Sequence, residues 1–268
     1  MEHLDLEEVI RFVFRVVRGR PEENVEYRTR RTLSEPARLR REIVGWLDEV
    51  TKSEPFLDLG CGAGALLAAA AAEGRRTGIG IDVSMVWLVV AKRLIESFGG
   101  TAVLAAAFAE ALPLADGSVR GVVSLDVIEH VANPVTYLRE IDRVTAQGAS
   151  LALATPNRFS LAPEPHVRVW GVGWLPRRWQ RAYAERRSTI SYAYIRLLST
   201  MEMQVLLRDN TRFDASVLIP AIPDEEIALA GRSRVMLART YNVLIRLTPG
   251  QRLALLVGAY FRVVGRRR

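Results

Sequence analysis

Short apolar runs alternate with longer stretches of helical periodicity through the middle of the chain. The apolar runs predict strands at Phe56–Leu59, Thr77–Ile81, Ala102–Ala106, Gly121–Leu125 and Ser150–Ala154. The stretches between them predict helices at residues 65–73, Ser84–Phe98, Ala109–Leu112 and Pro134–Thr145. Alternation at this spacing is typical of an α/β fold, in which a parallel sheet carries helices on both faces. Ligands of such sheets bind at the carboxyl ends of the strands.

The N-terminal part of the chain predicts helices without strands. Apolar residues recur at helical spacing over Leu4–Val17, and the Gly-Arg-Pro sequence that follows ends this stripe. A second helix is expected at Pro36–Val50, after the polar stretch 24–35. Within that stretch, Tyr27–Arg31 are either contacts to a ligand over which the helices close or part of a solvated basic loop. We therefore expect residues 1–50 to form an N-terminal helical segment.

The C-terminal part of the chain mixes both periods. Tyr192–Leu207 predicts a helix, Phe213–Ile219 a strand, and Asp224–Leu247 a mostly helical segment. The last apolar stretch has two interpretations. It is an amphipathic anchor on an anionic membrane, supported by the closing arginines, or a final strand at Ala259–Val264 that pairs antiparallel with the Phe213 strand. Its β-branched and aromatic residues favour the strand.

The first predicted strand leads into three alternating glycines, Gly60, Gly62 and Gly64, and then into an alanine-rich helix. Glycine adopts backbone angles closed to other residues and lets a ligand reach the main chain, and the free N–H groups of the helix point into the same space. The pattern predicts a nucleotide-binding turn. Gly60, Gly62 and Ala65 also satisfy the dinucleotide fingerprint, so the glycines alone leave the nucleotide open.

Polar residues around the turn narrow the choice of ligand. Asp82 lies roughly 20 residues on, where a carboxylate binds ribose hydroxyls. Its other interpretation is a helix cap, a role for which Ser84 is better placed. Asp58 precedes the turn and suits a ligand with a cationic ammonium or sulfonium end better than a pyrophosphate. Cys61, the only cysteine, is expected to be a small buried residue within the turn, and an intramolecular disulfide or a cysteine-built metal site is excluded.

Ionisable residues follow the fourth and fifth predicted strands. Asp126, Glu129 and His130 come directly after an apolar run. The fifth strand leads into a segment rich in proline, glycine and tryptophan, residues 161–180, which contains His166 and predicts an ordered lid or substrate wall without a regular helix. Neutral imidazoles near pH 7 make both histidines candidate bases. His130 could also be structural or bind a metal with the two carboxylates, but the spacing is no strong metal signature and no metal site is assigned.

Composition bounds the class of protein. With 268 residues, of which 49% are hydrophobic, the chain suits one folded unit. We find neither a signal-peptide pattern nor an uncharged run of about 18 residues, so we expect a cytoplasmic protein, with peripheral membrane contact as a further expectation. The net charge of +7 favours an anionic substrate, an anionic membrane or nucleic acid. The arginine clusters are too sparse to favour nucleic acid.

Taken together, these patterns resemble the class I S-adenosylmethionine-dependent methyltransferases, in particular the branch with quinone-biosynthesis and bacterial tailoring enzymes. The resemblance covers about residues 40–160 and rests on DLGCGAG at 58–64, GID at 80–82, the stretch 109–131, NPVTYLREIDRV at 133–144 and TPN at 155–157. It implies a Rossmann-like seven-stranded sheet, mostly parallel with an antiparallel last strand. The methyltransferase domain would span 51–268, with the lid inserted at about 156–190.

The resemblance also implies S-adenosyl-L-methionine as cofactor and S-adenosyl-L-homocysteine as product. Asp58 and the glycines would hold the methionine part, Asp82 both ribose hydroxyls, and the Leu125 carbonyl the cofactor's ammonium. The implied cofactor-binding residues are Asp58, Gly60, Cys61, Gly62, Gly64, Asp82, Val83, Ala109, Glu110 and Leu125. Two positions depart from the family pattern. The carboxylate that commonly recognises adenine is replaced in the stretch Ala107–Ala109, and Trp87 stands where a methionine is common.

Our leading hypothesis is O-methylation of a small-molecule or lipid-linked metabolite with hydrophobic or anionic character, with His130 and His166 as catalytic residues. A methyl group leaves a sulfonium by in-line displacement, so the protein supplies alignment and, for a hydroxyl acceptor, a base. Three alternatives remain: an RNA or other nucleic-acid methyltransferase, an NAD(P)-dependent oxidoreductase, and a cofactor-binding module without activity.

Overall fold

A single seven-stranded sheet organises the protein. The computed structural model describes residues 5–18, 22–75, 78–222 and 232–268. The strand order is β3-β2-β1-β4-β5-β7-β6, with β7 antiparallel to both of its neighbours and all other pairs parallel. The strands are β1 (Phe56–Leu59), β2 (Gly78–Asp82), β3 (Ala102–Ala106), β4 (Val119–Leu125), β5 (Thr145–Pro156), β6 (Phe213–Leu218) and β7 (Tyr260–Arg267). The fold class and the predicted strands are thereby confirmed, except that Thr77, the expected first residue of the second strand, lies outside the described residues.

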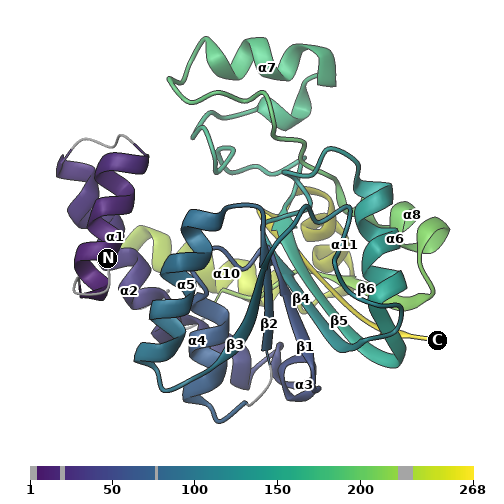
Figure 1. The fold of residues 1–268 in the computed structure, drawn as a ribbon. Helices are drawn as coiled ribbons and strands as arrows, with labels where there is room; N and C mark the ends of the chain where they lie inside the picture. The colour runs from purple at the N-terminus through teal and green to yellow at the C-terminus, as the bar shows by residue number, and fades with distance from the viewer. Residues whose placement is uncertain (1–4, 19–21, 76–77, 223–231) are drawn as a thin grey trace.

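Helices cover both faces of the sheet (Figure 1). One apolar cluster packs β1, β4 and β5 against α6 and α8, and a second packs the other face against α3, α4 and α5. The helices are α1 (Leu6–Phe12), the π-helix η1 (Val13–Val17), α2 (Glu22–Val44), α3 (Asp48–Lys52), α4 (Ala65–Ala72), α5 (Met85–Ser97), α6 (Pro134–Val144), the 3-10 helix η2 (Val172–Trp174), α7 (Arg177–Glu185), α8 (Thr200–Asn210), α10 (Arg232–Leu244) and α11 (Thr248–Val257). None of the described helices has the length and apolar content needed to cross a bilayer.

The last strand decides between the two interpretations of the C-terminus. Residues 260–267 form β7, which lies between β5 and β6, and its Phe261 and Val263 are fully buried. A membrane anchor at this segment is therefore wrong, because its apolar side chains complete the core. The predicted segment Asp224–Leu247 is helical from Arg232 onward, and residues 223–231 lie outside the described residues.

The N-terminal helices differ from the expectation in two respects. The helix expected at Pro36–Val50 ends at Val44, and a turn separates it from α3. The polar stretch 24–35 is helical throughout, within α2, so its interpretation as a loop is wrong. Ion pairs one helical turn apart, such as Glu26 with Arg30, and an inward-facing stripe of Val25, Leu39 and Ile43 stabilise this helix despite its low apolar content.

Three further boundaries are corrected. Ala109–Leu112 is a turn and not a helix, because the backbone hydrogen bonds of a helix are not formed there. The apolar side chains of Ala109 and Leu112 belong to the core. The helix expected at Tyr192–Leu207 begins only at Thr200, because Ser199 and Glu202 form a capping box. The insertion after β5 does contain a regular helix, α7.

We call residues 158–197 the cap. Figure 1 shows the cap beyond the carboxyl ends of the strands, with α7 as its outermost element. Its two ends lie side by side, because Asn157 pairs with Leu198 in an isolated parallel bridge and Arg158 N–H donates to the Leu198 carbonyl at 3.0 Å. The cap is thus an insertion whose two ends lie next to each other at the end of β5.

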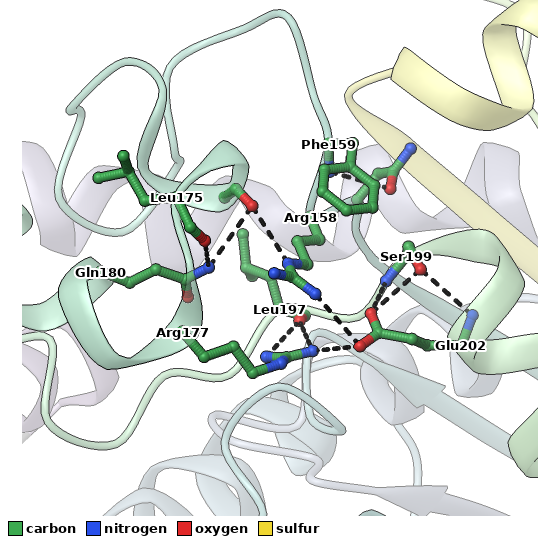
Figure 2. A network of polar contacts seen from close by, with 10 residues as sticks. Arg158, Phe159, Leu175, Arg177, Gln180, Leu197, Ser199 and Glu202 are labelled. Carbon is green, nitrogen blue, oxygen red and sulfur yellow. Dashed lines mark hydrogen bonds and ion pairs between the residues drawn. The ribbon is translucent and has the colours of Figure 1, made fainter.

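A polar network fixes the cap to α8 (Figure 2). Glu202 Oε1 accepts from Arg177 at 2.6 Å and from Arg158 at 3.3 Å, while its Oε2 accepts from Ser199 N–H at 2.8 Å. Arg177 also donates to the Leu197 carbonyl. One carboxylate therefore caps α8 and holds both the beginning of the cap and the beginning of α7.

Replacing Glu202 with alanine is expected to loosen the cap and lower the free energy of unfolding by about 1–2 kcal/mol, because a helix cap and two ion pairs are lost together. Hydrogen exchange should accelerate in residues 158–197 but not in the sheet. The matched control is Asp209→Asn on the same helix, whose ion pair with Arg208 is exposed. Unchanged exchange in the cap would contradict this role.

Candidate active site

The glycine turn lies where the strand order reverses. β1 has β2 on one side and β4 on the other, so the turn after β1 opens at the switch point of the sheet. Gly60 and Cys61 donate to the Ile81 carbonyl at 2.7 and 3.1 Å, and Gly62 donates to Asp82 Oδ2 at 2.9 Å. The ends of β1 and β2 are thereby bound to each other, and Asp82 is part of the turn.

The three glycines are required for different physical reasons, although all have positive φ. A Cβ on Gly60 would lie 2.2 Å from Val127 Cγ2, and one on Gly64 would lie 2.8 Å from the Cβ of Ala91. A Cβ on Gly62 would meet nothing within 4 Å. Gly60 and Gly64 therefore permit close packing, whereas Gly62 faces the open space in which a ligand would touch the backbone.

Asp58 and Cys61 are buried below the turn. Burial, and then the charge of Asp82, raise the pKa of Asp58 to about 8. A cationic ligand group would favour the carboxylate form of Asp58. Burial also raises the pKa of the Cys61 thiol, so this residue is a poor nucleophile and fills space as the sequence predicts.

Asp82 has capacity for further hydrogen bonds. Its Oδ1 accepts from Ser84 N–H at 2.8 Å, so Asp82 and not the Ser84 side chain satisfies the start of α5. Ser84 is the N-cap residue of α5, as expected, although its side chain makes no capping hydrogen bond. An ionised carboxylate offers about four acceptor positions, and two remain for ribose hydroxyls.

The expected adenine side is more open. Val83 is exposed, as is Phe108, whose exposed fraction is 68%. Ala109 packs on the core, and Glu110 Oε1 accepts from the Ala132 N–H at 2.8 Å before α6. Glu110 thus has a clear structural contact, while Phe108 offers an aromatic face on which a base could stack.

A second group of residues comes from the loop after β4 and from the cap. Leu125 ends β4, and Asp126 follows with a φ of 56°, an unusual value for a residue other than glycine. Glu129 is fully buried; its Oε2 accepts from Thr155 at 2.9 Å, and its Oε1 has no hydrogen-bond partner in the described part of the chain. Burial, and then the charge of Asp126, raise the pKa of Glu129 to about 7.

The two predicted catalytic histidines meet, although 36 positions separate them in the chain. The rings of His130 and His166 lie 4.8 Å apart at 90°. His166 Nε2 lies 4.0 Å from Glu129 Oε1, and His166 Nδ1 lies 2.6 Å from Glu164 Oε1. Sequence reasoning missed Glu164, and the only signal for it was its position two residues before the histidine.

The two imidazoles have opposite shifts. Burial and the charge of His166 lower the pKa of His130. Burial also disfavours the charged form of His166, but the hydrogen bond and charge of Glu164, with the charges of Glu129 and Asp126, outweigh it and raise the His166 pKa. The two candidate bases can therefore be distinguished by pH, because His130 loses its proton at a lower pH than His166.

The same group has the donor set of a metal site. One ligand atom from each of Glu129, His130 and His166 lies within 4.8 Å of the others. Carboxylate and imidazole donors suit several divalent cations. Among the described residues, Asp126, expected as a donor, is not part of this group.

A cavity of about 380 Å³ opens between the N-terminal helices and the glycine turn. Phe14 and Trp87, whose rings are 5.3 Å apart, form its aromatic wall. The remaining lining residues are Arg28, Arg31, Thr32, Glu35, Ala63 and Ala65. Residues Tyr27–Arg31 thus contribute to the site from a helix, with Arg28 and Arg31 in the cavity.

Comparison with known proteins agrees with this geometry. The pattern of a family described as a methyltransferase domain matches residues 57–153. The ubiquinone biosynthesis O-methyltransferase of Cereibacter sphaeroides is 35% identical over 124 residues, 46% of this chain and 50% of that protein. The enzyme of the same name from Pseudomonas aeruginosa is 35% identical over 122 residues, 43% of this chain and 50% of that one. The chain therefore spans about half the length of the curated relatives it matches.

Solved structures support the fold. A SAM-dependent methyltransferase of Thermotoga maritima, described as a possible histamine N-methyltransferase, aligns over 98% of this chain and 100% of its own, with a TM-score of 0.52 and 18% identity. The phosphoethanolamine N-methyltransferase 2 of Haemonchus contortus in complex with S-adenosyl-L-methionine aligns over 86% of this chain and 52% of its own, with a TM-score of 0.55 and 17% identity.

Proposed function

Because the chain carries a class I S-adenosylmethionine-dependent methyltransferase domain, we propose that it transfers the methyl group of S-adenosylmethionine to a hydroxyl oxygen of a small-molecule or lipid-linked metabolite. The observation that carries this proposal is the meeting of two groups across the β1–β4 switch point. Gly62 and Asp82 form an open cradle on one side, and His130, His166 and Glu129 gather on the other. Val127 packs against Gly60 and joins the two groups.

The residues of the cradle fit the cofactor. Gly62 leaves its backbone open, Asp82 retains acceptor positions for two hydroxyls, and Asp58 supplies a carboxylate beneath the turn. When bound, S-adenosylmethionine supplies an electrophilic methyl group on a positively charged sulfur. The domain assignment and the carboxylate of Asp58 both favour this cofactor over NAD(P).

On the acceptor side, the protein has to orient a hydroxyl group and take its proton. His166 Nε2 faces the buried Glu129 and the ring of His130, and it is the candidate acceptor atom for that proton. His130 would then position the acceptor. The cap that carries His166 lies beyond the carboxyl ends of the strands, on the same side as this space.

The proposal is tested with the full chain and labelled S-adenosylmethionine, offered phenols, catechols and lipid-linked hydroxyl compounds in parallel with amines. Methylated hydroxyl products and S-adenosylhomocysteine should appear together. Methylation of amines alone would contradict the hydroxyl acceptor, and NAD(P) binding without S-adenosylhomocysteine binding would overturn the function.

We propose a divalent cation as an alternative occupant of the acceptor site. It is favoured by Glu129 Oε1, which lies beside two imidazoles and has no hydrogen-bond partner among the described residues. Calorimetry with Mg²⁺, Mn²⁺ and Zn²⁺ separates the two possibilities. Saturable metal binding that Glu129→Gln abolishes would show that this group of residues binds a metal. If no metal binds, proton transfer remains the proposed role of the group.

Arg31 is expected to bind the carboxylate of the cofactor's methionine part, since it faces the cavity beside the turn and its side chain has no partner within the described residues. Arg31→Ala should weaken S-adenosylhomocysteine binding about tenfold, because one charge-assisted hydrogen bond is lost. Binding of methylthioadenosine, which lacks that carboxylate, should not change. Arg30→Ala, which removes an exposed ion pair with Glu26 on the same helix, is the control. Equal losses for both ligands would contradict this contact.

We also propose the division of the chain into an N-terminal helical segment, residues 1–50, and a methyltransferase domain, residues 51–268.

We also propose that the cap provides the expected membrane contact. Its Trp170, Trp174 and Trp179 have exposed rings, and residues 158–190 contain seven arginines against two glutamates. Tryptophan and arginine together suit the interface of an anionic bilayer. Sedimentation with phosphatidylglycerol vesicles should retain the protein, with phosphatidylcholine vesicles as control. A salt-sensitive RNA complex without vesicle binding would favour the nucleic-acid alternative.

A further inference from the structure

Glu164 is a buried carboxylate in a tight loop of the cap. Its Oε2 accepts from the backbone N–H groups of His166 at 2.9 Å and Val167 at 2.8 Å. The loop is closed further by Glu164 N–H, which donates to the Val169 carbonyl at 2.9 Å, and by Arg168 N–H, which donates to the Glu164 carbonyl at 2.8 Å. The carboxylate therefore has one orientation, with Oε1 left for the imidazole.

That orientation determines which nitrogen of His166 carries the proton. An ionised carboxylate only accepts hydrogen bonds, so the 2.6 Å contact of Glu164 Oε1 requires a proton on His166 Nδ1. In the neutral ring, Nε2 then has a free lone pair. It points toward Glu129 Oε1, and the 4.0 Å between them is too long for a direct hydrogen bond.

The other ionisable groups near the ring do not compete for Nδ1. Glu129, Asp126 and His130 come from the loop after β4 and lie on the Nε2 side or act on His166 through charge. Tyr260 of β7 interacts electrostatically with Asp126. Of the described residues, Glu164 makes the contact that decides the tautomer.

We infer that Glu164 is the positioning residue of His166, which holds the ring with Nδ1 protonated and presents Nε2 as the proton acceptor to the hydroxyl substrate. This inference rests on the proposed function. The arrangement follows the logic by which a carboxylate orients a general base through its second nitrogen. Both residues come from the cap, so the base enters the site only when this loop is folded.

The decisive variant is Glu164→Gln. The glutamine oxygen has to remain with the two backbone N–H donors of residues 166 and 167, which turns the amide NH2 group toward Nδ1. Nδ1 then becomes the acceptor, and the proton moves to Nε2. The expected result is a reversed tautomer, a kcat lowered by about tenfold or more, and little change in KM. Glu164→Asp, which keeps the charge, should restore part of the activity.

Nitrogen-15 NMR of histidine-labelled protein reads the tautomer directly. The chain has three histidines, and His166→Asn identifies the His166 signals by their absence. Spectra are recorded above the pKa of the ring and after dialysis against a chelator, so that protonation alone is observed. Glu185→Gln is the matched control, since this carboxylate accepts from Ser191 and the Tyr192 N–H at another part of the cap.

An Nε2-protonated ring in the unsubstituted protein would overturn the inference, as would an unaltered tautomer in Glu164→Gln. The spectrum of the unsubstituted protein decides the matter even where the glutamine variant does not fold. Because the tautomer is measured without turnover, an Nδ1-protonated ring in a protein that methylates nothing would contradict the proposed function and leave Glu164 in its positioning role.

Discussion

Replacing Asp82 with alanine is expected to weaken S-adenosylhomocysteine binding by about 100-fold or more. Hydrogen bonds to a charged group are each worth roughly 1.5–3 kcal/mol, and this carboxylate would lose two to the ribose. The variant also removes the acceptor of the Gly62 and Ser84 N–H groups, so the cradle itself loses its fixed shape. Titration calorimetry measures the change.

The control for Asp82 is Asp116→Ala, which removes a carboxylate paired with Arg143 near the start of β4, at the opposite edge of the sheet. It should leave cofactor affinity unchanged. Thermal unfolding of both variants separates loss of binding from loss of fold. A stably folded Asp82→Ala protein with undiminished affinity would remove Asp82 from the cofactor site.

His166→Ala is expected to lower turnover by about 100-fold or more while cofactor affinity stays intact, because the proton acceptor is lost and the glycine turn is untouched. His130→Ala should have a smaller effect if His130 only positions the acceptor. Single-turnover rates with saturating cofactor, together with calorimetry, provide both readouts. Equal activity of His166→Ala and the unsubstituted protein would leave this histidine a structural role only.

The pH dependence of the rate distinguishes the two histidines further. A base acts in its neutral form, so the rate should rise with pH through its pKa. The His166 pKa is raised above its ordinary value of 6.5, and that of His130 is lowered. A rise centred below pH 6.5 supports His130. A rise centred above it supports His166 if it persists in Glu129→Gln, because Glu129 has a pKa of about 7 and lies 4.0 Å from His166 Nε2. The profile of His130→Ala should keep the higher midpoint.

The parts of the fold that the sequence predicted well are those whose signal is local. The strand at Phe56–Leu59 and the turn after it follow from a few neighbouring residues, because apolar runs and glycines act within the same segment. The polar part of α2 was missed for the opposite reason. Its stability comes from ion pairs and from packing against α4, which apolar periodicity does not register.

The acceptor side was predicted only in part for a related reason. His130 and His166 were both identified by residue type and by position after a strand. Their approach to 4.8 Å depends on how the cap folds back, and so does the contact of Glu164 with the ring. Glu202 likewise gains its importance from Arg158 and Arg177, which lie 44 and 25 positions earlier in the chain.

The adjacent ends of the cap bear on how this protein could change its substrate. The chain leaves the sheet at Asn157 and returns at Leu198, its partner in the same bridge, and Glu202 of α8 adds a second attachment through Arg158 and Arg177. Such a segment can be exchanged or shortened without disturbing strand register. Grafting a different segment between these two residues would replace the proposed base and the proposed acceptor wall together, while the proposed cofactor cradle on β1 and β2 would stay as it is. On the proposed function, the choice of acceptor would be separable from the binding of the methyl donor.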